Sequence, residues 1–350
     1  MIKRIHIVLS CTICALFTQP VLALNLDIWG LGHLSVDRAD NGTDDSTFVA
    51  SNSSRLAVSG DQDLDNGISI IFQYESGVDL TGRGENDGNG GADSSGQLFT
   101  RTRDAFVGIS GGFGKAQVGR MGGLNEWVYD FNLFADQVGD LGNIWGGTGL
   151  FGRVDNLVRY TTPDFAGFNI GLSYAPEEGV DDSDVGVIKV NYANEGLKFG
   201  AAFMSQGTGS TDEHEAAALT GSYNFGMFTI GAGYQDESDI GGIRGNDRDG
   251  FTVGASVAIG NGTIKGQVTQ TNGDGSETDA TQWAVGYDHN IGKNTTVYIA
   301  YAKTDNDANT SFSANNYGHG DDFGAGVPGD DPDVISVGLV YSFRARVWPR

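Results

Sequence analysis

The sequence predicts an all-β protein, a 16-stranded antiparallel transmembrane β-barrel. Three observations lead to this fold class. The 350 residues include 55 glycines and only 6 prolines, and no stretch shows the 3.6-residue apolar repeat of a long helix. Segments that alternate apolar and polar residues recur along the chain, and the connections between them are alternately short and long. Short turns at one end and long polar loops at the other are typical of outer-membrane barrels.

The first 23 residues are expected to form a secretory signal peptide. A basic start, Met1–Arg4, precedes an apolar run, Ile5–Phe17, and Val21–Ala23 fits the small-x-small cleavage pattern. The run is shorter than the about 18 apolar residues of a membrane-spanning helix. Both cysteines, Cys11 and Cys14, lie in this segment. The rest of the chain therefore contains neither disulfides nor thiolate metal sites.

The chain is strongly acidic, with a formal net charge of −24 at pH 7. This sign disfavours nucleic-acid binding, which depends on cationic contacts to phosphates. A high charge can also indicate disorder, but 10% aromatic residues and the regular alternation argue for a folded chain.

Sixteen candidate strands follow the leader. The first alternates strictly and is long enough for a tilted crossing, which takes about 9–11 residues. The even number suits a barrel whose two termini lie on the same side. The predicted strands span residues 24–37, 48–60, 67–80, 98–110, 113–121, 153–162, 167–175, 184–193, 197–206, 214–223, 227–235, 250–259, 263–270, 280–289, 295–303 and 332–343.

The two faces of these strands differ in character. In residues 168–174 the even positions are Phe, Ile, Leu and Tyr, as expected of a face in contact with lipid. In residues 265–269 the odd positions are Lys, Gln and Thr. Such polar inner faces predict a wet lumen, and a barrel of about 16 strands is wide enough for an aqueous channel.

The stretch Gly122–Gly152 breaks the alternation. It is long, aromatic and acidic, and Arg120 and Arg153 flank it. We expect it to fold into the space that the wall encloses.

Several motifs resemble the Gram-negative general diffusion porins: Asn52–Leu56, Phe72–Gly77, Leu98–Gly108 and Gly152–Val154. The resemblance covers nearly the whole mature chain. It implies an outer-membrane channel for passive diffusion of small hydrophilic solutes and ions, without enzymatic activity or cofactor. It also implies a homotrimer surrounded by lipid and lipopolysaccharide. The barrel would span residues 24–343, and residues 344–350 form an extension beyond the terminal aromatic residue of the family.

In that family the loop after the fifth strand folds into the barrel, and its acidic edge faces arginines on the wall. By matching motifs, residues 122–152 are this constriction loop. The pore-lining arginines implied here are Arg55, Arg103 and Arg153. The opposing carboxylates are, in order of preference, Asp136, Asp140, Asp130 and Glu126. Opposed charges across a narrow lumen favour polar solutes over apolar ones.

The alternative for the arginines is that they pair with Glu75 or Asp155 and only neutralise the wall. For the whole protein, two alternatives stay open: a substrate-specific porin, or a surface adhesin or structural barrel with a plugged lumen.

Catalytic and metal-binding motifs are weak. Gly108–Gly112 fits G-x-S-x-G, but no helix follows it to expose a nucleophile. The histidines are scattered and suggest no metal site. Two acidic pairs, at residues 321–322 and 330–331, are expected to be solvated, or alternatively to bridge divalent cations to lipopolysaccharide.

Overall fold

The structure, a computed structural model, describes residues 24–82, 99–123, 131–146, 152–177, 179, 181–210, 212–320, 323 and 326–348. The predicted signal peptide lies outside these residues, as do Glu126 and Asp130. Among the residues that are described, no helix is long and apolar enough to cross a membrane.

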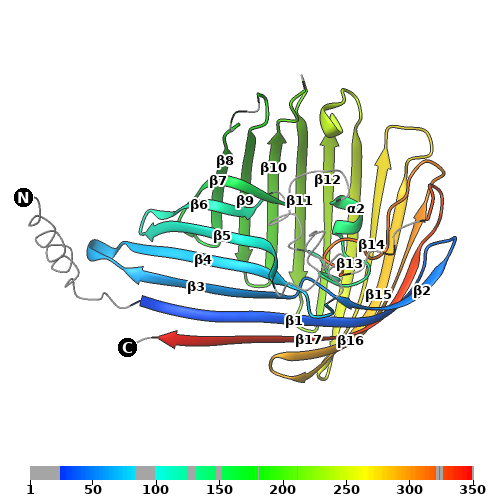
Figure 1. Cartoon of the computed structure of the whole chain (residues 1–350), viewed down its shortest axis with the longest axis horizontal. Coiled ribbons are helices and arrows are strands. Elements are labelled where there is room, and N and C mark those ends of the chain that lie inside the picture. Colours follow the sequence, from blue (N-terminus) through cyan, green and yellow to red (C-terminus); the bar gives the residue numbers. More distant parts are fainter. Residues whose placement is uncertain are drawn as a thin grey trace, which may run out of the picture.

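One antiparallel sheet closes on itself to form a barrel (Figure 1). Consecutive strands pair, and β1 closes the ring by pairing with β17. A closed sheet has no unpaired edge, which is the condition for crossing hydrocarbon with strands. The strands in the described residues are β1 (Leu24–Asp40), β2 (Asp45–Ser51), β3 (Arg55–Asp63), β4 (Ser69–Val78), β5 (Phe99–Gly111), β6 (Gly114–Gly122), β7 (Arg153–Thr161), β8 (Phe168–Ala175), β9 (Val185–Asn194), β10 (Leu197–Gln206), β11 (His214–Asn224), β12 (Phe228–Ser238), β13 (Arg248–Ile259), β14 (Gly262–Gly273), β15 (Ala280–Gly292), β16 (Thr295–Asn306) and β17 (Asp333–Trp348).

β2 and β3 both pair with β1 and share one position in the wall. The barrel therefore has sixteen strand positions, which confirms the predicted fold class. The predicted strand 48–60 is interrupted at Asn52–Ser54, where Ser53 has a left-handed φ of 45°. The break is closed by hydrogen bonds to β1: Asn52 N donates to His33 O (2.8 Å), and His33 N donates to Ser54 Oγ (2.9 Å).

Short turns connect the strands at the end of the barrel where β1 begins and β17 ends. The turn between β9 and β10 has only two residues, Glu195 and Gly196, with φ of 44° and 90°. Two successive positive φ values match the right-handed twist of a hairpin. The longer connections lie at the opposite end, as the sequence predicts.

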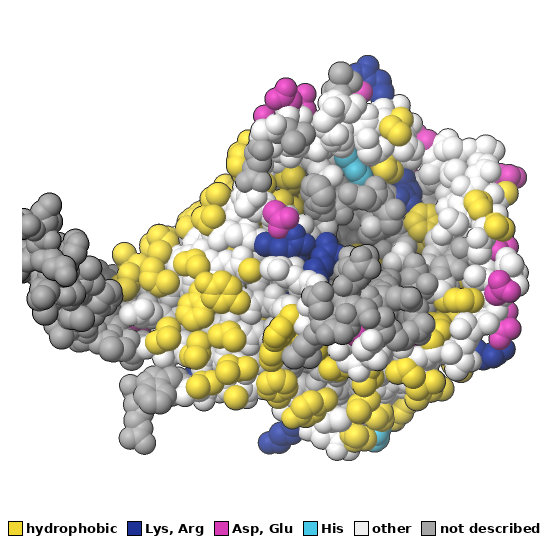
Figure 2. All heavy atoms as spheres, in the orientation of Figure 1, with side chains coloured by type: hydrophobic (Ala, Val, Ile, Leu, Met, Phe, Trp, Pro, Cys, Tyr) yellow, Lys and Arg dark blue, Asp and Glu magenta, His cyan; other side chains and the backbone are white. Residues whose placement is uncertain are grey.

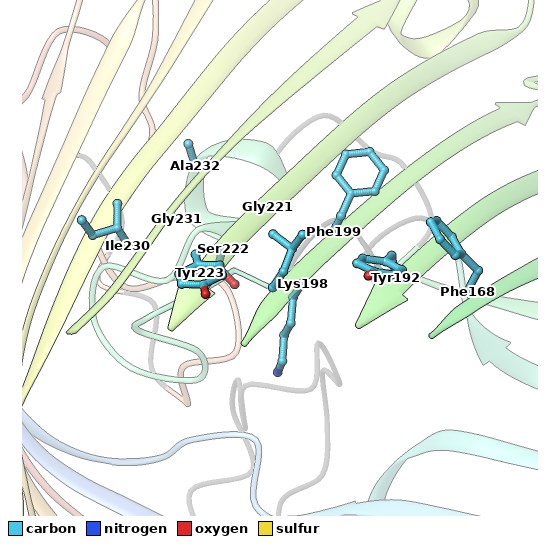
Figure 3. Close-up of a pocket in the computed structure, with 11 residues that line it drawn as sticks. Phe168, Tyr192, Lys198, Phe199, Gly221, Ser222, Tyr223, Ile230, Gly231 and Ala232 are labelled. Atoms are coloured by element: carbon cyan, nitrogen blue, oxygen red, sulfur yellow. The ribbon is translucent and has the colours of Figure 1, made fainter. Parts of the chain in front are cut away.

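The outer surface is rich in exposed apolar side chains, as Figure 2 shows on one side of the molecule. The predicted lipid-facing row on β8 is exposed, from Phe168 (47%) to Tyr174 (51%). A shallow apolar groove crosses the outer wall between β8 and β12, with Phe199 and Tyr223 in its lining (Figure 3). Lys198 extends away from these rings. The groove therefore belongs to the outer surface and not to the lumen.

Several predicted strand boundaries differ from the structure, and those at the two ends of the chain have structural consequences. The predicted strands leave a loop at residues 38–47, but β1 runs to Asp40 and β2 begins at Asp45. Asn41 makes this tight turn possible because its Oδ1 accepts the backbone N–H of Thr43 (3.0 Å) and of Asp44 (2.8 Å).

The last strand continues past Phe343, its predicted end, to Trp348. Its added residues pair with the start of β1, where Trp29 opposes Arg344 and Asp27 opposes Arg346. Both arginines lie close to the Asp27 carboxylate, at 3.4 and 3.1 Å. The extension therefore completes the ladder between the first and last strands.

Ending the chain after Phe343 should lower the temperature at which the barrel unfolds, because the last rungs between β17 and β1 are lost. The measurement is the heat-induced mobility shift in electrophoresis. Asp27→Asn is the control, since it removes the ion pairs and keeps the rungs. Equal unfolding temperatures for the full and shortened chains would show that the extension adds no stability.

Candidate pore constriction

Residues 131–146 lie inside the barrel and are named here the inner loop. They include the short helix α2 (Gly142–Trp145), which lies within the ring of strands in Figure 1. Asp140 organises the turn before α2, because its carboxylate accepts N–H bonds from Asp136 (2.7 Å), Gly142 (2.7 Å) and the Asn132 side chain (2.8 Å). Three donors to one carboxylate hold the backbone of this loop in a single conformation.

Wall glycines receive the bulky side chains of the inner loop. Phe131 lies over Gly231, where an added Cβ would be 2.4 Å from the ring. Phe134 lies over Gly286 with a corresponding distance of 2.9 Å. The rings can touch the strand backbone only because these positions lack a side chain. The same relation holds for two further pairs, Leu133 over Gly254 and Trp145 over Gly233.

Wall amides bind the polar groups of the inner loop. Gln267 Oε1 accepts the backbone N–H of Leu133 (2.9 Å). Gln282 donates to the backbone carbonyl of Asp140 (3.1 Å) and accepts from the Asn143 side chain (2.9 Å). These bonds satisfy loop groups that burial removes from water. The inner faces of β12–β15 are therefore a docking surface for the inner loop.

A row of paired charges continues from the inner loop along the wall and is called the charge row. Its members are Asp136, Arg55, Glu75, Arg103, Asp104 and Arg153. Arg55 lies 3.1 Å from Asp136 of the loop and 3.9 Å from Glu75 on β4. Arg103 also contacts Glu75, at 2.5 Å. The predicted contact between an arginine and a loop carboxylate is thus present at Arg55 and Asp136, whose side chains are each about a quarter exposed.

An extra residue in β5 directs two consecutive side chains to this row. Arg103 and Asp104 together oppose the single residue Glu75, because the register with β4 shifts there. Arg103 binds Glu75, and Asp104 binds Arg153 at 2.6 Å. Regular alternation would send one of the two neighbours to the outer face, so the bulge brings both charges to the row.

The other two arginines lie beside similar irregularities. Arg55 follows Ser53, whose φ is 45°, and Arg153 is three residues before Asn156, whose φ is 53°. Bulges commonly re-aim side chains next to functional sites. All three predicted arginines therefore lie in, or within three residues of, a local departure from regular strand geometry.

Asp140 does not occupy the position predicted for it. Its side chain is buried, with 2% of the residue exposed, and it serves the turn of the inner loop. Burial, and next the charge of Asp136, raise the pKa of the Asp140 carboxyl to about 7. Glu126 and Asp130 lie outside the described residues, so Asp136 is the predicted loop carboxylate that is seen beside an arginine.

The alternative in which the three arginines pair with Glu75 or Asp155 of the wall is present in part. Glu75 does pair with Arg55 and Arg103, but Asp155 pairs with Arg120 at 2.5 Å. The Arg120–Asp155 pair is separate from the pairs of Arg55, Arg103 and Arg153, and Arg120 also donates to the backbone carbonyl of Thr102. The wall carboxylates therefore share the arginines with the loop.

Further inner-face cations were not among the predicted site residues. Arg159 donates to Ser173 Oγ (2.9 Å) and to the carbonyl of Gly122, where the chain leaves β6. Lys265 lies 2.9 Å from Asp288 and donates to Gln137 of the inner loop (2.9 Å). The alternation along β14 already predicts Lys265 on the inner face, and the same period of two along β7 could have identified Arg159.

In the described part of the chain, no group of three or more His, Cys, Asp or Glu side chains is arranged to hold a metal ion.

The comparison with protein families decides the identity of this barrel. A family model described as Gram-negative porin matches residues 10–309. The chain belongs to the Gram-negative porin family. It is an outer-membrane porin that forms a diffusion channel, and it is not an enzyme. The predictions of family, function and location are confirmed, and the alternative of a plugged adhesin barrel is excluded.

Relatives extend over most of this porin. Outer membrane porin protein 32 of Delftia acidovorans is 28% identical over 361 residues, covering 96% of this chain and 97% of the relative. Major outer membrane protein P.IB of Neisseria gonorrhoeae is 26% identical over 299 residues, covering 76% and 80%. The solved structure of an anion-selective porin from Comamonas acidovorans has a TM-score of 0.78 at 24% identity, covering 91% of this chain and all of that one.

Gly231→Ala should disturb the docking of the inner loop. The added Cβ would overlap the Phe131 ring, and overpacking of this kind costs about 1–3 kcal/mol. Moving the ring away from the wall narrows the lumen, so single-channel conductance in symmetric salt should fall. The control is Gly221→Ala on the neighbouring strand, where an added Cβ meets nothing closer than 3.7 Å. Equal conductance in the two variants would show that the glycine is not needed for docking.

Proposed function

We propose that the inner loop narrows the channel and that the charge row beside it makes the porin prefer small anions. The supporting observation is the state of the carboxylates near the loop. Asp136, Glu75 and Asp104 each contact an arginine, and Asp140 is buried. The carboxylates seen at this level are therefore neutralised or withdrawn from the lumen.

Positive charge remains around them. Arg159 lies on the inner face of β7 and donates to Ser173 Oγ and to the carbonyl of Gly122. Lys198 stands on the inner face of β10, next to a small cavity beside Phe131 of the inner loop. Arginine keeps its charge at any usual pH. In the described residues, these cations add positive charge beside the charge row, although the chain as a whole is acidic.

The net charge of the chain has little influence on this preference. Many of the carboxylates lie in the connecting loops, and charges separated by more than about 8 Å are screened at physiological ionic strength. Similarity supports the same selectivity, because one related structure is described as an anion-selective porin.

The proposal includes a homotrimer in contact with lipid and lipopolysaccharide. The support is similarity in fold to OmpT of Vibrio cholerae, whose structure is described as a trimer form, with a TM-score of 0.69 at 17% identity. Residues 1–23 are proposed to be a cleaved signal peptide.

Selectivity is tested by the reversal potential of planar bilayers under a salt gradient. The unmodified porin should show anion preference. Replacing Arg55, Arg103 and Arg153 together with glutamine should shift the potential toward cations, because their carboxylate partners are left uncompensated. Arg120→Gln is the matched control, since this arginine pairs with Asp155 and not with Asp136, Glu75 or Asp104. A triple variant with unchanged selectivity would remove the charge row from the explanation.

A further inference from the structure

We propose that residues 312–320, in the long connection between β16 and β17, form a brace that holds the inner loop in place and sets the largest solute that passes. This inference rests on the proposed role of the inner loop in narrowing the channel. The sequence predicted only a polar loop over residues 304–331. In the structure, residues 312–320 contact both the inner loop and a second part of the wall, at β1 and at the break between β2 and β3.

The brace binds the inner loop at several points. The backbone N–H of Gly139 donates to the carbonyl of Ala314 (2.9 Å), and the backbone N–H of Tyr317 donates to Asn143 Oδ1 (2.7 Å). The Tyr317 ring lies against Gly142, where an added Cβ would be 2.2 Å from it. Backbone and side-chain contacts together hold the first two residues of α2, Gly142 and Asn143.

The other end of the brace is attached to the first two wall positions. The backbone N–H of Gly320 donates to Asn52 Oδ1 (2.9 Å). His319 Nε2 lies 3.3 Å from Asp37 Oδ2 of β1, and both side chains are fully buried. Ser35 Oγ also donates to this Asp37 oxygen (2.7 Å), which fixes the carboxylate in place. Removing the His319 side chain would leave the buried Asp37 carboxylate without this partner, which is unfavourable inside a protein.

Two glycines allow the brace to pass close to the site. Gly318 has a φ of 69°, and an added Cβ there would be 2.7 Å from the Asp136 carboxylate. At Gly320 an added Cβ would be 2.2 Å from the carbonyl of Ser51. The brace therefore runs directly beside Asp136, the loop residue that contacts Arg55.

These contacts attach the inner loop to two separate parts of the wall. The inner loop docks on β12–β15, while the brace is attached to β1 and to the break between β2 and β3, beyond β16 and β17. A loop attached at one place retains conformational freedom, whereas a loop attached at two places has lost more of it. Releasing the brace should leave the barrel intact and allow the inner loop to move out of the lumen.

The test uses the double variant Tyr317→Ala/His319→Ala in the full-length porin. We expect higher single-channel conductance in symmetric salt, and entry of larger uncharged sugars in liposome swelling, than for the unmodified porin. His289→Ala is the control, because this histidine contacts Tyr287 near the short-turn end and not the brace. The heat-induced mobility shift shows whether each variant has formed its barrel.

A folded double variant with unchanged conductance and unchanged sugar limit would overturn the brace. If the double variant does not fold, Gly318→Val provides the same test. It disturbs the brace where it passes Asp136, and it keeps His319 and Gly320, the residues that contact the wall.

The reversal potential of the unmodified porin separates the two proposals. Anion preference with an unchanged sugar limit in the variants rejects the brace alone, and a lack of anion preference in the unmodified porin rejects the proposed selectivity alone.

Discussion

The docking of the inner loop on the inner faces of β12–β15 is the interaction on which the shape of this pore depends. A barrel with sixteen strand positions encloses more space than its own side chains fill, so a narrow lumen requires a further segment inside it. Wall glycines such as Gly231 let an aromatic ring lie against the strand backbone. Wall amides such as Gln267 satisfy the loop's polar groups. The glycines and amides of the wall thus determine where the inner loop lies.

Electrostatics at the loop depends on strand irregularities as much as on residue type. The bulge in β5 directs Arg103 and Asp104 to the same row, where each meets an opposite charge. Such pairs are stronger when they are partly removed from water. They also cancel much of the transverse field that free opposed charges would create. In the proposed mechanism, selectivity follows from these arginines together with the neighbouring inner-face cations, and the acidic character of the whole chain has little part in it.

The sequence was sufficient for the fold and for part of the site. A strand that crosses a bilayer needs one apolar face, and the connections between such strands are alternately short and long. Both features can be recognised along the sequence. Asp136 and Asp140 could not be separated, because both are acidic residues of one irregular loop and only its turn determines which is buried. The brace was missed for a related reason: its contacts run from Tyr317 and His319 to distant residues, and no periodicity marks them.

We propose that Asp136, which contacts Arg55, lies in the constriction of an open lumen, where the inner loop holds it. Residues 24–350 contain no cysteine, so Asp136→Cys supplies a single thiol in the mature chain. A bulky anionic thiol reagent added to the open channel should lower its conductance stepwise as each pore is modified. Complete labelling, shown by mass spectrometry, together with unchanged conductance would contradict this account.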